Sequence, residues 1–235
     1  MDITAKITLL TGLGGVVLGA LLSWAWFIFE KYLDRRSRHF NALVRIEYTM
    51  SENLDTSYSN ISGLEQFKDM LEKKHLFYFS FKEFNSPQPA IYDLQNIRFI
   101  NDIFEIHLDM ERVNNSIAAL AGRYAKIVDS FLVAGGHRNP EATNDYFENA
   151  NIVIRDIDMI LSFARKLDSR LVEITAKSKV LFNHRPRLID QMVRWLGRVD
   201  TTPEKFDQEV ATTSQVIQKD RERHTEEYGV SNDVN

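Results

Sequence analysis

A stretch of 23 residues without a charge, from Ile7 to Phe29, limits what the N-terminal part of this chain can form. A helix of that length is about 35 Å long, enough to cross a hydrocarbon core of about 30 Å. Trp24, Trp26 and Tyr32 lie near its C-terminal end, where amphipathic rings favour the headgroup level. A core helix this long rarely lacks a polar face, and a cleaved signal peptide has a shorter apolar stretch. The pattern predicts an uncleaved transmembrane helix over residues 7–29.

The charges on either side of this segment predict its orientation. Only Lys6 precedes it, whereas four basic residues follow closely: Lys31, Arg35, Arg36 and Arg38. The positive-inside rule then places residues 1–6 outside and the C-terminal body in the cytoplasm, at the inner membrane of a cell. The alternative orientation places the body in a periplasm or a lumen. Lipid is the first partner that the sequence predicts, with Arg35, Arg36 and Arg38 at the membrane surface.

Two glycines inside the apolar segment form a GxxxG pair, Gly15 and Gly19. Their spacing leaves two bare backbone patches on one helix face, where a second membrane helix can approach closely. The pair therefore suggests transmembrane association, with another copy or with another protein. The alternative is that glycine is simply common in membrane helices and that this one has no partner.

Proline placement and apolar spacing predict long helices in the rest of the chain. Proline is excluded from helix interiors, and the five prolines leave residues 1–86, 90–139 and 141–185 free of it. Within the second of these ranges, ten apolar residues recur at alternating steps of four and three, a heptad seam rather than the period of two of a strand. The seam consists of Phe99, Ile103, Ile106, Met110, Val113, Ile117, Leu120, Tyr124, Ile127 and Phe131.

A turn follows this seam, because residues 134–140 contain two glycines and then a proline. A second, largely heptad run continues to about residue 183. Helices over about 90–134 and 140–183 would form an antiparallel hairpin some 60 Å long. The predicted fold class is all-α: a single N-terminal transmembrane helix, then an elongated antiparallel helical bundle over residues 30–199 with coiled-coil-like long helices.

The region between the membrane segment and the hairpin is harder to interpret. Apolar spacing through Leu43, Ile46 and Met50 indicates that the membrane helix continues into the aqueous phase and ends near Gly63. Residues 64–84 fit helical spacing, but within residues 75–84 the aromatic residues also alternate like a strand. We predict a helix, because an isolated strand has nothing to pair with.

The C-terminal third has a basic part and an acidic part. Residues 184–199 resemble a short amphipathic helix that lies on anionic headgroups. The residues predicted to contact the membrane are Arg185, Arg187, Arg194, Trp195 and Arg198. The alternative is an ordinary last helix packed on the bundle, and a nucleic-acid patch is disfavoured because no binding motif accompanies the arginines. Residues 200–235 predict an acidic peripheral helix starting near Pro203 and a disordered tail.

The sequence offers little for catalysis. The chain has no cysteine, which excludes disulfides, thiolate metal sites and cysteine nucleophiles. The densest titratable cluster fits the solvated face of a helix better than a metal site, because the Glu-x-x-His spacing of di-iron bundles occurs on neither helix of the predicted hairpin. We predict no enzyme activity and no cofactor. The cluster consists of Asp102, Glu105, His107, Asp109 and Glu111.

Two functional hypotheses remain. The first is a membrane-anchored scaffold or adaptor whose helical body binds an unknown protein partner or itself. The alternative is a signalling or effector subunit, in which association of the membrane helix is coupled to a switch in the cytoplasmic bundle.

Overall fold

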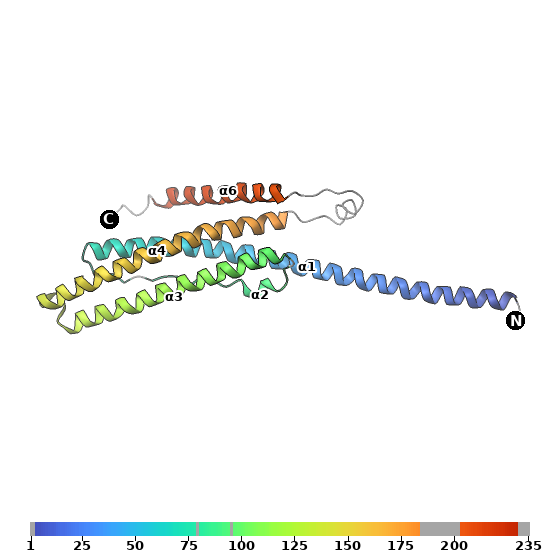
Figure 1. The fold of residues 1–235 in the computed structure, drawn as a ribbon, viewed down its shortest axis with the longest axis horizontal. Coiled ribbons are helices and arrows are strands. Elements are labelled where there is room, and N and C mark those ends of the chain that lie inside the picture. The colour runs from blue at the N-terminus through green and yellow to red at the C-terminus, as the bar shows by residue number, and fades with distance from the viewer. Residues whose placement is uncertain (1–2, 79, 95, 184–202, 230–235) are drawn as a thin grey trace.

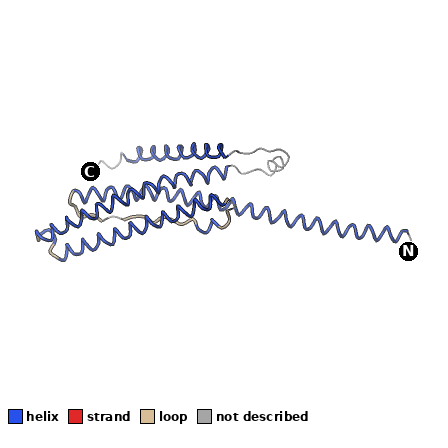
Figure 2. The backbone as a smooth tube through the Cα atoms, in the orientation of Figure 1, coloured by secondary structure: helices blue, strands red, loops and turns tan. Residues whose placement is uncertain are grey.

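The computed structural model describes residues 3–78, 80–94, 96–183 and 203–229. Four long helices form a bundle, joined by a short helix and a single 3₁₀ turn, and no strand occurs in these ranges (Figures 1 and 2). The predicted all-α class and helical bundle are confirmed. The elements are α1 (Ile3–Glu72), α2 (Gln88–Ile91), α3 (Ile97–Val133), η1 (Gly136–Arg138), α4 (Pro140–Asn183) and α6 (Pro203–Gly229).

Helix α4 is the central element, since it packs against α1, α3 and α6. Helices α1, α3 and α6 all run antiparallel to α4 (Figure 1). The N-terminal part of α1 extends beyond the bundle as a single helix, while its C-terminal part lies inside (Figure 1). One uninterrupted helix thus belongs to two different environments.

The heptad seam of α3 forms its buried face. Of the ten predicted seam positions, nine are buried, and the exception is Ile127, which is half-buried. Val128 is buried in its place, because the seam steps by four and then three after Tyr124. The predicted apolar positions of α1 in the bundle are likewise buried, so the helix continues into the bundle as predicted; they are Leu43, Ile46, Met50 and Leu54.

Local chemistry explains where the α3–α4 hairpin begins and turns. The Asn96 side chain accepts hydrogen bonds from the backbone N–H groups of Arg98 and Phe99 and so caps α3. The turn uses Gly135 at φ 99° and Gly136 at φ 58°, a left-handed region that side chains disfavour. Asn139 then caps α4 by accepting from the N–H groups of Glu141 and Ala142.

The prediction for residues 63–84 is wrong in part. Helix α1 does not end near Gly63 but continues to Glu72, and Lys74 then adopts a φ of 62° that stops it. The described residues between His75 and Pro87 are neither helix nor strand. Residues 75–78 and 80–87 lie between α1 and α3 (Figure 1), and hereafter we call these residues the extended segment.

Asparagine side chains replace the missing second strand. Asn53 donates to the carbonyl of Asn85 (2.8 Å) and accepts from its N–H (2.7 Å). Asn60 does the same for Lys82, at 2.8 and 2.9 Å. Seven residues of helix rise about 10.5 Å and three extended residues about 10 Å, so the two spacings match. The expectation of a helix failed because it counted only backbone partners for these polar groups.

Helix α3 supplies hydrogen bonds from the other side. The N–H of Phe84 donates to the Asn114 amide oxygen (3.1 Å), and that of Phe77 donates to the Tyr124 hydroxyl (3.1 Å). Phe84 is buried, while Phe77 and Phe81 are partly buried against the core. The extended segment thus fills the space between α1 and α3 as part of the core.

Ion pairs at steps of seven fix the register of α3 against α4. Asp102 pairs with Lys177 (2.8 Å), Asp109 with Arg170, and Arg123 with Asp156. From one pair to the next, the residue number rises by seven or fourteen on α3 and falls by the same amount on α4, as antiparallel helices require. Pairs at this exposure contribute at most about 1 kcal/mol each, so their role here is alignment.

Candidate functional site

The N-terminal part of α1 is the first candidate, as a membrane-contacting site. It is the one helix in the described ranges that is long and apolar enough to cross a membrane. Every described residue from Gly12 to Arg35 is exposed, so no other described part of the chain covers its leucines and aromatic rings. A helix that is apolar all round needs an apolar environment.

Gly15 and Gly19 lie on this uncovered stretch. A Cβ atom added at either position would have no neighbour within 4 Å. None of the described residues therefore requires glycine there, and the two bare patches are open to an approaching helix. Their predicted role in association stays a prediction.

The basic residues after the apolar stretch lie on the single-helix part of α1. Arg35 and Arg38 are exposed, and Arg38 pairs with Asp34 at 3.1 Å. Arg36 lies over the ring of Phe40, at 5.7 Å. Their guanidinium groups lie between the apolar stretch and the bundle, where a headgroup layer would meet them. The other predicted membrane-contact residues, Arg185, Arg187, Arg194, Trp195 and Arg198, lie outside the described residues.

The transition from exposed helix to bundle core takes place around His39. Phe40 is partly buried, and Ala42 and Leu43 are fully buried. His39 is half-buried; desolvation lowers the pKa of its imidazole, which a hydrogen bond with the backbone of Asp93 partly offsets. Its Nδ1 atom is buried without a hydrogen-bond partner in the described part of the chain. The loop after α2 therefore rests on α1 where the bundle begins.

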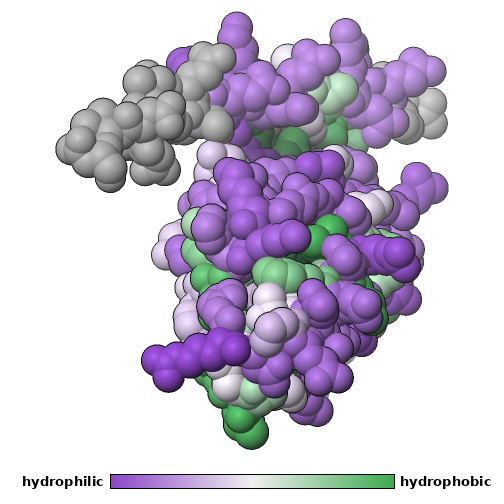
Figure 3. Space-filling model, turned by 90° about the vertical axis from the view of Figure 1, so that its left-hand side faces the viewer, coloured by the Kyte–Doolittle hydropathy of each residue, from purple (hydrophilic) through white to green (hydrophobic). Residues whose placement is uncertain are grey.

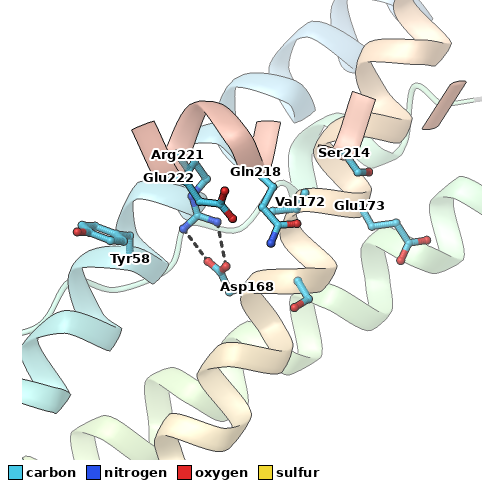
Figure 4. A pocket seen from close by; sticks show the side chains of 9 residues that line it. Tyr58, Asp168, Val172, Glu173, Ser214, Gln218, Arg221 and Glu222 are labelled. Atoms are coloured by element: carbon cyan, nitrogen blue, oxygen red, sulfur yellow. Dashed lines mark hydrogen bonds and ion pairs between the residues drawn. The ribbon is translucent and has the colours of Figure 1, made fainter. Parts of the chain in front are cut away.

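A second candidate is a hollow of about 460 Å³ between α1, α4 and α6 (Figure 4). Arg221 of α6 and Asp168 of α4 point toward one another across its floor and form two hydrogen bonds of 2.9 Å. Tyr58 of α1 and Gln218 of α6 line its sides. The contact between Arg221 and Asp168 therefore attaches α6 to α4 at this hollow.

Helix α6 rests lightly on the bundle. Val210 is buried against Ala176 and Val180, with Phe206 and Ile217 partly buried beside them. Viewed from the end of the bundle far from the apolar stretch, α6 stands above a largely hydrophilic surface with apolar residues beneath it (Figure 3). It begins at Pro203, as the sequence predicts, and residues 230–235 lie outside the described ranges.

The acidic cluster of α3 is mostly engaged by α4. Arg170 bonds both Glu105 (2.9 Å) and Asp109, and Lys177 bonds Asp102. His107 lies 3.5 Å from Glu111 of its own helix. Within residues 3–183 and 203–229, apart from positions 79 and 95, no group of three or more histidine or carboxylate side chains could hold a metal ion. The cluster aligns two helices.

Sequence reasoning missed two sets of residues that matter here. One is the set of asparagines that bind the extended segment, and the other is the Arg221–Asp168 contact. A signal for the first was present, because Asn53 and Asn60 fall seven residues apart among apolar seam positions of α1. The chain matches no family model, no curated protein and no solved structure.

Proposed function

We propose that this protein is a single-pass membrane-anchored helical scaffold or adaptor. The observation that carries the proposal is the continuity of α1, which is exposed and apolar up to Phe29 and forms core from Ala42 onward. A continuous helix holds the bundle at a set distance from the bilayer. The bundle then offers long helical faces to a protein partner, or to a second copy. The proposal includes no catalytic step and no cofactor.

The proposed orientation places the N-terminus outside and the bundle in the cytoplasm, at the cell inner membrane. The excess of basic residues after the apolar stretch supports it. The test combines carbonate extraction of membranes with protease access to a C-terminal tag in spheroplasts and in sealed inverted vesicles. Carbonate resistance with protection in spheroplasts is expected. Extraction by carbonate would overturn the anchor, and cleavage from outside would overturn the orientation.

We also propose that Gly15 and Gly19 mediate association of the membrane helix. The test replaces both with leucine and measures energy transfer between labelled copies in vesicles. Gly14 is the matched control, because at 100° per residue it lies on a different helix face. Loss of transfer in the Gly15→Leu/Gly19→Leu variant, with transfer kept in Gly14→Leu, is expected. Equal transfer in all three proteins would contradict the role.

The membrane-surface role proposed for the arginines after the span and in residues 185–198 predicts a preference for anionic lipid. The full chain is reconstituted in vesicles with and without phosphatidylserine. Limited proteolysis within residues 184–199 is then compared between the two. Protection by anionic vesicles alone is expected, and identical cleavage would contradict the proposal.

The alternative function is a signalling subunit, and the same continuity of α1 favours it. An unbroken helix transmits rotation, since one inserted residue turns the bundle by about 100° against the membrane helix. The chain lacks cysteine, so a Leu22→Cys variant, on the helix face of Gly15 and Gly19, gives a single disulfide between two membrane helices. A signalling subunit would change hydrogen exchange in α3 and α4 on crosslinking, and lose that change with a one-residue insertion after Arg35. A scaffold would show no change.

A further inference from the structure

On one face of the α3–α4 hairpin, the row of ion pairs between the two helices is interrupted by an apolar side chain. The ion-pair steps of seven run Asp109–Arg170 and then Arg123–Asp156. Between these two pairs, seven residues from each along both helices, the facing positions are Ser116 on α3 and Phe163 on α4, which carry no charge. Both line a hollow of about 400 Å³ whose floor includes the buried residues Val113, Ile160 and Leu167.

A second hollow, of about 440 Å³, lies on the same face nearer the far end of the hairpin. Its lining includes Arg123 and, seven residues further along each helix from the Arg123–Asp156 pair, Ser130 and Asn149. The two hollows therefore lie along one line of α3–α4 contacts. About 18 residues of α4 separate their centres, or about 27 Å along the helix. We call this line, lined by residues 109–134 and 142–167, the hairpin groove.

Beside the hairpin groove, α4 carries apolar side chains that the described residues leave about half exposed. Ile152, Met159 and Phe163 are 49%, 53% and 54% exposed. Their spacing of seven and four places them on one helix face. The described parts of α1 and α6 contact other faces of α4. The ion pairs with α1 are at Asp158 and Arg165, and α6 packs at Asp168, Ala176 and Val180. A row of half-exposed apolar side chains beside a groove is typical of a surface that receives an amphipathic helix.

The charge of the hairpin groove selects the kind of helix. The side chains lining the two hollows include four cations and two carboxylates, although the whole chain has a net charge of -4. Among the described residues, Lys126 and Lys166 have no acidic partner. A second copy laid against the same face would bring these lysines toward each other, which like-charge repulsion opposes.

We propose that the hairpin groove binds an acidic amphipathic helix of a partner protein. The proposal rests on the scaffold function, for which it specifies the class of partner. Apolar residues of the partner at steps of three and four contact Met159, Phe163 and Ile152. Its carboxylates contact Lys126 and Lys166 at the two hollows. A length of about 18 residues or more covers both.

The test measures binding of a designed peptide to the full chain in zwitterionic nanodiscs. The probe is a fluorescent 21-residue peptide of three Leu-Glu-Ala-Leu-Leu-Glu-Glu repeats, read by anisotropy, with empty nanodiscs subtracted. A matched peptide has lysine in place of every glutamate. We expect saturable binding of the acidic peptide, at least about tenfold tighter than that of the basic one. Equal binding of both peptides, or no saturable binding of the acidic one, would overturn the proposal.

Variants then locate the binding. Met159→Glu/Phe163→Glu should weaken binding of the acidic peptide by about tenfold or more, since it places charge in the contact. Val216→Glu, on α6 and equally exposed at 54%, is the control that should bind normally. The swap Lys126→Glu/Lys166→Glu should weaken the acidic peptide and strengthen the basic one, and it does not touch the core. Unchanged binding in both groove variants would place the site elsewhere.

These outcomes are separable from those of the anchor test. A chain that resists carbonate extraction but does not bind the peptide disproves the hairpin groove alone. A chain that binds the peptide but is extracted by carbonate disproves the anchor and keeps the groove. Thermal unfolding by circular dichroism confirms that each variant is folded.

Discussion

The two parts of α1 share one helix but differ in what surrounds them. From Gly12 to Phe29 the apolar residues point in every direction and are exposed. From Phe40 onward the buried apolar residues occupy one face, and buried polar residues such as Asn53 lie among them. The difference shows that the angular spread of apolar residues around a helix, rather than their number, indicates whether the helix suits surrounding lipid or a protein core.

The largest effect on stability that we expect comes from replacing one phenylalanine in each part of α1 with alanine. Phe67 is 0% exposed and Phe27 is 52% exposed. Phe67→Ala should lower the free energy of unfolding of the bundle by about 3–5 kcal/mol, because it leaves a cavity. Phe27→Ala should leave it unchanged. Denaturant unfolding of the full chain in nanodiscs measures both, and a similar loss in both variants would mean that the N-terminal part also packs against protein.

The converse substitution tests the apolar part. Leu18→Arg should disfavour membrane insertion by about 2.5–3.5 kcal/mol, because it places a charge near the centre of the span. The carbonate-resistant fraction should fall, while Leu18→Ala should insert normally. Unfolding of the bundle should be unaffected, since Leu18 is exposed. Full insertion of the arginine variant would argue against a spanning helix.

The polar face of the C-terminal part gives the next effect. Asn53→Ala removes both hydrogen bonds to the backbone of Asn85. The loss should be about 1–3 kcal/mol of unfolding free energy, since each of the two hydrogen bonds contributes about 0.5–1.5 kcal/mol net. Hydrogen exchange of the Asn85 amide should rise with it. Asn101→Ala, at an exposed position of α3, should change neither quantity.

These residues also show how far the sequence could lead. Periodicity predicted the α3 seam and the glycine turn, because both depend on local spacing and local backbone conformation. It failed for residues 73–84, whose conformation depends on side chains more than twenty positions away, such as Asn60 and Asn114. The hairpin groove was equally hidden, since only the pairing of Ser116 with Phe163 across two helices reveals it.

A smaller effect concerns the attachment of α6. Asp168→Asn weakens the paired hydrogen bonds between residue 168 and Arg221. The side chains of Arg221 and Asp168 are only 25% and 22% exposed. The expected loss is about 1 kcal/mol, so α6 should detach more often and its amides should exchange about fivefold faster. Asp220→Asn is the control, because Asp220 pairs within α6 with Arg223. Equal exchange in both variants would show that the apolar contacts alone hold α6.

The smallest expected effect lies at the boundary between the two parts of α1. Burial lowers the pKa of His39 below its ordinary value of 6.5, and the hydrogen bond with the Asp93 backbone only partly offsets this. The unfolded chain therefore takes up a proton at a higher pH than the folded one. Stability should decrease as the pH falls through 6.5 and level off below the folded pKa.

The His39→Gln variant isolates this contribution, because glutamine keeps a polar side chain but does not titrate there. Denaturant midpoints of both proteins are compared between pH 7.5 and pH 5, and the decrease should be smaller in the variant. Since α1 meets the loop after α2 at His39, the exchange protection of the amides around Asp93, corrected for the intrinsic pH dependence of exchange, should fall at low pH in the wild-type chain alone. Identical pH profiles would mean that water reaches the imidazole freely at this boundary.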